Sequence, residues 1–282
     1  MYFLQLIILN NSISSVNIDK RRIFMKKINI VFSFVFVLFL VSCADSEVTQ
    51  TTDEAETNVG PFYAQFLACN AGPDFNQENL DSMIADFNNL NLSDDLVWAG
   101  GYAPVEGQNQ YTNGWWELNW TSKEAADAGW ETWMADEEAQ AWDERTNNVL
   151  ECDNDSLSGW NFYTPGTTTM EDWSSFATQT FECEFNEGKS SEDLKANVEE
   201  YNKWVDENAS DDPYYYGIYF AEDGSGDGFI WLNWHDSFDS MKAGNDNWAE
   251  TGQSVQAGFD ETATCKTPDL YNSAEFYSAE AS

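Results

Sequence analysis

Basic residues are scarce in this sequence. Its 282 residues include 12 lysines and arginines against 50 aspartates and glutamates, a formal net charge of −38. Five of the basic residues but only one acidic residue precede Cys43, so the remainder carries a net charge of −42. Such a surface repels phosphate backbones, so we exclude nucleic acids as partners. The acids are spread along the chain, which favours a solvated, repulsive surface over the alternative of cation or cationic-ligand capture.

Histidine and paired cysteines are also lacking. His235 is the single histidine, and the cysteines stand alone, without a Cys-x-x-Cys pair. Because structural zinc sites use such pairs, we expect no metal site built from these cysteines. The sequence contains no Walker loop, no dinucleotide fingerprint and no serine nucleophile elbow, and we expect no cofactor.

The N-terminal part has the layout of an export signal. Met25-Lys26-Lys27 is followed by an apolar run, residues 28–39, and then by Leu40-Val41-Ser42-Cys43. A charged start, a short apolar run and a small residue are typical of signal peptides, and the run is too short to span a membrane. The tetrad resembles the lipobox of bacterial lipoproteins, which implies cleavage before Cys43 and lipidation of its sulfur.

Five segments follow from these patterns. Residues 1–24 are interpreted as an upstream extension wrongly included before a start at Met25, and residues 25–42 as the signal peptide. Residues 43–60 contain almost no large apolar side chain, which predicts a disordered acidic tether. The folded part is expected in residues 61–165 and 173–282.

These two folded segments are repeats of one unit. At an offset of 114 residues Cys69 falls on Cys183, Leu80 on Leu194, and Leu118-Asn119-Trp120 on Leu232-Asn233-Trp234. Cys152 falls on Cys265 at an offset of 113. Self-similarity at a fixed spacing indicates tandem duplication.

The first unit predicts alternating strands and helices. Leu80, Met83, Ile84 and Phe87 follow helical spacing, and Thr121 with Glu124 forms a capping box that opens a second helix carrying Trp130, Trp133, Met134 and Trp142. Strands are expected at 66–70, 96–103, 114–120 and 159–163. The order β-α-β-β-α-β is that of the ferredoxin-like unit, an α+β fold.

The third strand indicates that both sheet faces are covered. Trp116, Leu118 and Trp120 point to one face, while Trp115, Glu117 and Asn119 point to the other. Helices cover one face, so the sheet of the second repeat should cover the other and close a barrel. The chain here resembles the dimeric α+β barrel superfamily, with two tandem units spanning 62–277, which implies a monomer with an internal pseudo-dimer.

Four cysteines beyond Cys43 allow three disulfide pairings. The repeat selects Cys69 with Cys152 and Cys183 with Cys265, each inside its own unit. In the ferredoxin-like arrangement the end of the first strand lies beside the start of the fourth, which agrees with this choice.

The barrel interior is the first place to seek a site. Aromatic and small residues alternate along the second strands, so an aromatic cavity with a few polar groups is one interpretation and a filled barrel is the other. The expected lining is Trp98, Tyr102, Glu117, Asn119, Tyr215, Tyr219, Trp231 and Asn233.

Catalytic candidates come from the resemblance. Some members of the superfamily degrade haem or oxidise quinol-like compounds without a separate cofactor, using Asn, Trp and His. The nearest equivalents are Asn119, Asn233, Trp231 and His235, the last expected as a surface or capping residue at the start of a helix, opposite Thr121 of the first repeat. No histidine lies on a helix facing the barrel, which argues against haem.

A calcium loop is the remaining motif. Asp223, Ser225 and Asp227 with Gly228 match the spacing of the first half of an EF-hand loop, but Trp234 stands where the bidentate glutamate belongs. Glycine and aspartate are expected in a turn between two strands in any case.

We therefore expect an acidic lipoprotein anchored in the bacterial cell envelope. No acid follows Cys43 directly, which resembles the enterobacterial sorting pattern and implies the outer membrane. Its expected role is non-catalytic binding of a small apolar molecule or a partner. The alternative is a cofactor-independent monooxygenase-like enzyme in the same barrel, and an accessible cavity facing Asn119 or Asn233 would distinguish the two.

Overall fold

The computed structural model describes residues 62–166, 168–208, 212–222 and 226–279. The predicted extension, signal peptide, lipidated Cys43 and tether all lie outside these residues. The first repeat consists of β1 (Phe62–Ala71), α1 (Gln77–Phe87), β2 (Leu96–Pro104), β3 (Gly114–Trp120), α2 (Lys123–Ala135), α3 (Glu137–Thr146) and β4 (Leu150–Tyr163). The second consists of β5 (Phe176–Phe185), α4 (Ser191–Asn208), β6 (Tyr214–Ala221), β7 (Gly228–His235), α5 (Phe238–Thr251), α6 (Gln253–Thr262), β8 (Ala263–Cys265) and β9 (Asp269–Ser278).

Each repeat forms its own antiparallel sheet with the predicted strand order. In repeat 1 the order is β4-β1-β3-β2. In repeat 2 it is β9-β5-β7-β6, with the short β8 pairing with the end of β5. The long β4 of repeat 1 is thus divided into β8 and β9 in repeat 2.

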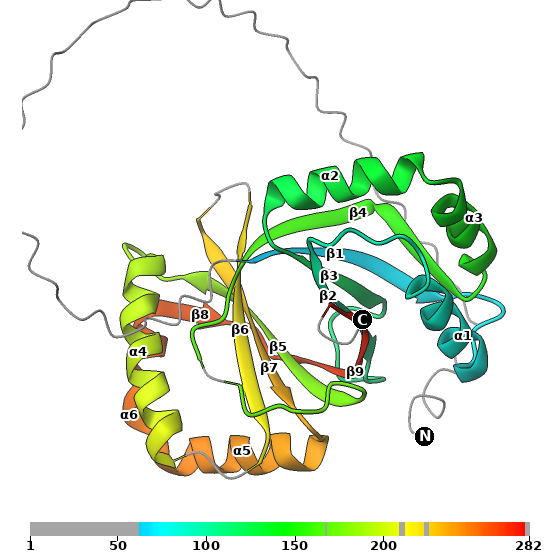
Figure 1. Ribbon diagram of the computed structural model, residues 1–282. Coiled ribbons are helices and arrows are strands. Elements are labelled where there is room, and N and C mark those ends of the chain that lie inside the picture. The colour runs from blue at the N-terminus through cyan, green and yellow to red at the C-terminus, as the bar shows by residue number, and fades with distance from the viewer. Residues whose placement is uncertain (1–61, 167, 209–211, 223–225, 280–282) are drawn as a thin grey trace, which may run out of the picture. The chain divides into compact units, whose positions relative to one another are not determined.

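The two sheets join into one barrel. Strand β2 pairs with β9, and β4 pairs with β6, so the edge strands of each repeat are covered by the other (Figure 1). Closure removes every open edge of the eight long strands, which would otherwise expose unpaired backbone groups. The expected intrachain α+β barrel is confirmed.

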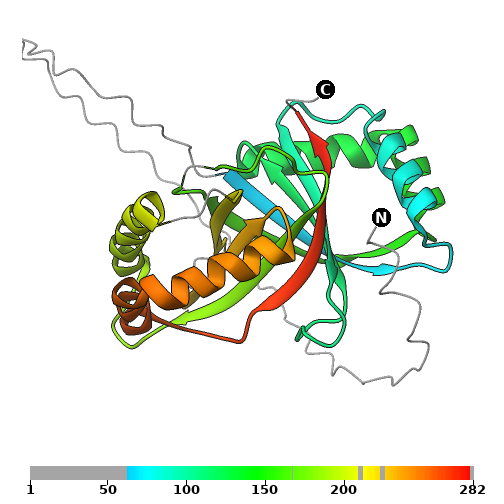
Figure 2. The same ribbon diagram turned by 90° about the horizontal axis from the view of Figure 1, so that it is seen from below.

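The helices lie outside the barrel in two layers, α1 to α3 against repeat 1 and α4 to α6 against repeat 2 (Figures 1 and 2). Helix α1 buries Leu80, Met83 and Phe87, the residues that share one face at helical spacing. No helix among the described residues combines the length and apolar character needed to cross a membrane.

Two predictions about the second helix of repeat 1 are wrong. The N-cap is Ser122, whose hydroxyl accepts from the backbone of Ala125, whereas Thr121 bonds to Asp95. The helix also breaks at Asp136, whose carboxylate accepts from the backbone of Glu138 and Ala139 and so caps the separate helix α3. A side chain that satisfies the free amides of a new first turn makes such a break inexpensive.

The disulfide pairing is confirmed. Cys69 is bonded to Cys152 and Cys183 to Cys265, and in both pairs the two residues face each other across neighbouring strands. Each bridge therefore ties the first strand of a repeat to the segment that returns after its last helix.

The repeats differ by one residue in the register of the third strand. Trp120 lies opposite Tyr63, but the residue opposite Ala177, which is 114 positions after Tyr63, is His235. The shared Leu-Asn-Trp residues of the two repeats are therefore shifted by one position relative to each other in the structure. Trp120 corresponds to His235 rather than to Trp234. Because side chains alternate along a strand, this shift exchanges the two faces of β7.

Candidate ligand-binding site

The space between sheet and helices in repeat 1 is filled by aromatic rings. Phe87 lies 5.4 Å from both Trp116 and Trp142, and Trp133 lies 5.6 Å from Trp142, measured between ring centroids. Trp120 covers the remaining end, where its ring approaches Gly129 so closely that a Cβ there would lie 2.5 Å from the indole. Glycine is required at position 129 to admit this ring.

Repeat 2 builds the same layer from related residues. Tyr201, Trp231 and Trp248 occupy the places of Phe87, Trp116 and Trp133, with ring centroids of Tyr201 5.4 Å from each of the two indoles. The remaining two positions have lost their indoles.

His235 stands where repeat 1 has Trp120, and Gly244 faces it where repeat 1 has Gly129; each glycine is the seventh residue of its helix. Gly258, the sixth residue of the ten-residue α6, stands where the ten-residue α3 has Trp142.

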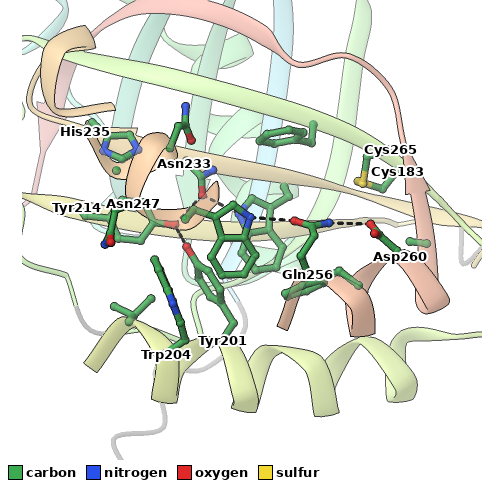
Figure 3. A pocket seen from close by; sticks show the side chains of 18 of the residues that line it. Cys183, Tyr201, Trp204, Tyr214, Asn233, His235, Asn247, Gln256, Asp260 and Cys265 are labelled. Atoms are coloured by element: carbon green, nitrogen blue, oxygen red, sulfur yellow. Dashed lines mark hydrogen bonds between the residues drawn. A yellow bond between two sulfur atoms is a disulfide. The ribbon is translucent and has the colours of Figure 1, made fainter. Parts of the chain in front are cut away.

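A cavity of about 370 Å³ lies between β5, β7 and the three helices of repeat 2, and His235 and Gly244 line it. Gly258 instead packs against Asn197 of α4, and the neighbouring Phe259 contacts Tyr201 and Trp231. The walls of the cavity are mainly aromatic, with Tyr201, Trp204, Trp231, Trp248 and Phe259 around it. Figure 3 shows Tyr214, Asn233 and His235 on the side of the sheet and Tyr201 and Trp204 projecting from a helix on the opposite side. The volume lies within the range of small-molecule pockets.

A hydrogen-bonded row forms the polar wall. The hydroxyls of Tyr201 and Tyr214 lie 2.6 Å apart, and Tyr214 donates to Asn233 Oδ1 at 2.7 Å. Trp231 Nε1 donates to the same oxygen at 2.7 Å (Figure 3). Asn233 Oδ1 is thus held by two donors. Burial raises the pKa of Tyr201 to about 12 and holds the pKa of Tyr214 well above its usual 10, so both hydroxyls stay protonated.

His235 is the last residue of β7 and is buried, so its expected place on the surface at a helix start is wrong. Burial lowers the pKa of its imidazole to about 4, although the negative charges of Asp236 and Asp212 raise it. The ring lies 4.9 Å from that of Tyr214 and is neutral at physiological pH. A neutral imidazole adds a polar group to the cavity without a charge.

Haem does not fit this arrangement. The single histidine projects from a strand and packs on Tyr214. The indoles of Trp204 and Trp248 meet at 4.7 Å on the helical side of the cavity, and leave no broad slot for a macrocycle.

The predicted barrel residues divide between two places. Trp98, Tyr102, Tyr215 and Tyr219 belong to the barrel core, and Asn119 and Glu117 lie on the same inward face of β3. The predicted inward orientation of Trp231 and Asn233 is wrong, because the register shift turns them toward the helices. Asn119 is buried, and its Oδ1 has no hydrogen-bond partner among the described residues.

Glu117 is the most buried acid of the barrel, with no exposed surface. Tyr102 of repeat 1 and Tyr219 of repeat 2 both donate hydrogen bonds to its carboxyl group, the second at 2.8 Å. Burial raises the pKa of Glu117 to about 7, although these hydrogen bonds act in the opposite direction. The equivalent inward position of repeat 2 is Leu232, so the single carboxyl group of Glu117 accepts hydrogen bonds from both pseudo-symmetric tyrosines.

One end of the barrel is open. A second cavity, of about 890 Å³, begins at the rings of Tyr102 and Tyr219 and widens toward the ends of β5 and β9. The other end is filled, with Phe162, Trp173 and Trp234 in edge-to-face contact. The barrel is thus hollow at one mouth and packed elsewhere.

The calcium motif gains no support from neighbouring ligands. Asp223 and Ser225 lie outside the described residues, and Asp227 lines the mouth of the barrel. Across the described part of the chain, no three His, Cys, Asp or Glu side chains are grouped to hold a metal ion.

Several residues of the repeat 2 cavity were absent from the predicted set, above all Tyr201, Tyr214 and Trp248. Tyr201 follows Leu194 and Val198 at helical spacing, which indicates a core residue, and Trp248 matches Trp133 of the first repeat. Comparing the side-chain sizes of equivalent positions in the two repeats indicates the cavity, but the equivalence depends on the register of β7, which the sequence does not show.

No family model matches the chain, and no curated protein matches it. Among solved structures it is similar to a protein from Lactobacillus acidophilus described provisionally as a monooxygenase, with 8% identity and a TM-score of 0.49 over 77% of this chain and 94% of that one. It is also similar to chlorite dismutase from Candidatus Nitrospira defluvii, with 10% identity and a TM-score of 0.47 over 76% and 92%. An anthrone oxidase-like protein gives 11% identity and a TM-score of 0.42 over 77% and 94%.

Proposed function

We propose that this chain is a non-catalytic binding protein for a small, planar, largely apolar molecule carrying a hydrogen-bonding group. The binding site is the cavity between sheet and helices of repeat 2. We further propose that the protein is anchored through a lipid on Cys43 in the bacterial cell envelope, at the outer membrane.

The contrast between the two repeats carries the proposal. Trp120 fills one end of this layer in repeat 1, whereas His235 at the matched position of repeat 2 lines an open cavity. An unfilled core space loses packing energy, with about 24 cal/mol for each Å³ of cavity. The cavity lowers the stability of the fold, and it is walled by aromatic rings and an ordered polar row. Both features are suited to a bound ligand.

The lining defines the ligand class. Flat aromatic walls favour offset or edge contacts with a planar molecule. Asn233, His235 and Gln256 supply the polar groups, and all three are uncharged at neutral pH because burial keeps His235 neutral. The charged lining residues, Asp212, Asp260 and Lys266, are all exposed, so a charge held against the buried aromatic wall would lack a partner beside it and a neutral molecule is favoured.

The variant His235→Trp tests the site. It places an indole where repeat 1 already holds Trp120 against a glycine, so the fold accommodates the change. We expect the wild-type protein to bind the neutral fluorescent probe N-phenyl-1-naphthylamine, and H235W to bind it at least tenfold more weakly. Fluorescence titration measures both.

Trp120→Phe at the matched position of repeat 1 is the control, and it should leave probe binding unchanged. Circular dichroism of each variant confirms folding. If folded H235W binds the probe as the wild type does, or if the wild type binds no apolar probe, the proposed site is wrong.

The anchor is tested separately. Mass spectrometry of protein purified from membranes of the native host should show lipid mass on Cys43, and Cys43→Ser should release the protein from the membrane fraction. Recovery of unmodified Cys43 in a membrane-bound protein would contradict the lipoprotein assignment.

A cofactor-independent monooxygenase is the second candidate, because Asn233 does face a cavity. Against it, Asn233 Oδ1 is already engaged by Tyr214 and Trp231, and no ionised base lies in the row. Oxygen uptake with dihydroxynaphthalene as substrate, lost in Asn233→Ala, would favour the enzyme. The binding proposal predicts no uptake above the buffer rate.

A further inference from the structure

The open mouth of the barrel has a composition different from that of the repeat 2 cavity. Its inner part is apolar and aromatic, with Phe66, Trp115, Trp160 and Tyr271 around it. Its rim carries the carboxylate side chains of Glu182, Glu184 and Asp227, and the buried Asp269 also lines the cavity. Among the described lining residues the only cation is Lys189, which lies 3.5 Å from Asp193.

The carboxylates at the rim are only partly neutralised. Glu182 pairs with Lys266 at 2.7 Å, and Asp269 accepts a hydrogen bond from the backbone of Gln110 at 2.7 Å. Glu184 and Asp227 are exposed on adjoining strand ends. The mouth therefore carries an excess of negative charge, which focuses a negative potential into a concave apolar site.

The floor adds a further carboxyl group. The rings of Tyr102 and Tyr219 separate the cavity from Glu117, and both hydroxyls point away from the cavity toward that acid. The bottom of the cavity is therefore aromatic, with the partly buried rings of Phe66 and Trp115 beside those of Tyr102 and Tyr219.

We propose that the barrel mouth binds an organic cation, such as a quaternary ammonium or protonated amine with apolar substituents. Aromatic faces attract such a cation through their quadrupoles, most strongly when water is displaced. The rim carboxylates complement the charge, and the inner aromatic wall accommodates the apolar substituents. An anionic or nucleotide-like ligand is disfavoured by the same charges.

This site is independent of the repeat 2 cavity. The barrel mouth is formed by the inward faces of strands from both repeats, whereas the other cavity lies on the outer face of β5 and β7. Closure of the barrel from the two halves brings the acidic ends of β5 and β9 next to Trp115 of β3, so the mouth exists only in the assembled chain.

The experiment compares phenyltrimethylammonium with its uncharged isostere tert-butylbenzene by isothermal titration calorimetry on the folded chain. We expect the cation to bind at least tenfold more tightly, with affinity falling as ionic strength rises because the rim is exposed. Equal affinity of the two compounds, or no binding of the cation, would overturn the proposal.

Two variants locate the binding. Trp115→Leu removes an aromatic face and should weaken cation binding about fivefold to tenfold, and the double variant Glu184→Gln, Asp227→Asn should weaken it about threefold to fivefold. The control E199Q/D206N removes two exposed charges from α4, away from the mouth, and should change little.

The rim variants keep the test decisive if W115L does not fold, because their side chains are exposed and outside the core. Unchanged cation binding in E184Q/D227N would sink the proposal, as would loss of cation binding in H235W, which would place the cation in the repeat 2 cavity instead.

Discussion

Tyr219 of repeat 2 donates a hydrogen bond of 2.8 Å to Glu117 of repeat 1, across the centre of the barrel. Tyr102, the equivalent tyrosine of repeat 1, donates to the other carboxyl oxygen. The two repeats thus share one buried acid, and the pseudo-symmetry of the barrel is broken at the facing Leu232.

Glu117→Gln should stabilise the protein at high pH. Burial raises the pKa of Glu117 from 4.5 to about 7, so ionisation is disfavoured in the folded state and stability falls as pH rises from 4.5 through 7. Relative to wild type, E117Q should be equally stable near pH 4.5 and more stable by up to about 3 kcal/mol at pH 8. Urea unfolding across this range measures the difference. The exposed Glu131→Gln serves as control, and a pH-independent difference for E117Q would contradict the assignment.

For His235 we predict the opposite dependence of folding stability on pH. Its folded pKa of about 4 lies below the usual 6.5, so the unfolded chain takes up the proton first and stability falls as pH drops from 6.5 to 4. His235→Gln should lack this loss, which amounts to about 3 kcal/mol in the wild type. Parallel stability curves for the two proteins over this range would rule out a buried neutral imidazole.

Tyr214→Phe should destabilise the polar row of the repeat 2 cavity. The hydroxyl donates to Asn233 and is paired with that of Tyr201, so its removal leaves two partly buried polar groups without this partner. We expect a loss of about 1 to 3 kcal/mol in the free energy of unfolding. Tyr111→Phe, at a 44% exposed tyrosine, should change it by less than about 0.5 kcal/mol. Equal changes in the free energy of unfolding for Tyr214→Phe and Tyr111→Phe would mean that the hydrogen-bonded row does not stabilise the fold.

Removal of either disulfide should destabilise the chain by similar amounts. The bridges close loops of nearly the same length, with sequence separations of 83 and 82. In the chain-entropy model each is worth roughly 4 kcal/mol. We expect C69S/C152S and C183S/C265S to shift the urea midpoint downward to a similar extent, and peptide mapping without reduction to recover the two native linkages. A bridge between the repeats in that map would contradict the pairing.

Much of the fold could be predicted from local pattern. The 114-residue repeat, the helical stripe ending at Phe87 and the alternation along residues 114–120 each reflect a period that backbone geometry imposes on buried faces. The disulfide pairing followed from the repeat, because equivalent cysteines must occupy equivalent places. The barrel followed from aromatic residues on both faces of a sheet.

The register of β7 and the two cavities were decided only by the tertiary structure. A single residue of slip exchanges the faces of a strand, and the shared Leu-Asn-Trp letters concealed it, so Trp231 and Asn233 were assigned to the wrong side. Whether a space is filled depends on the volumes of side chains brought together from separate elements. Trp120 closes one end of the layer in repeat 1, His235 leaves the matched end of repeat 2 open, and no local pattern records that difference.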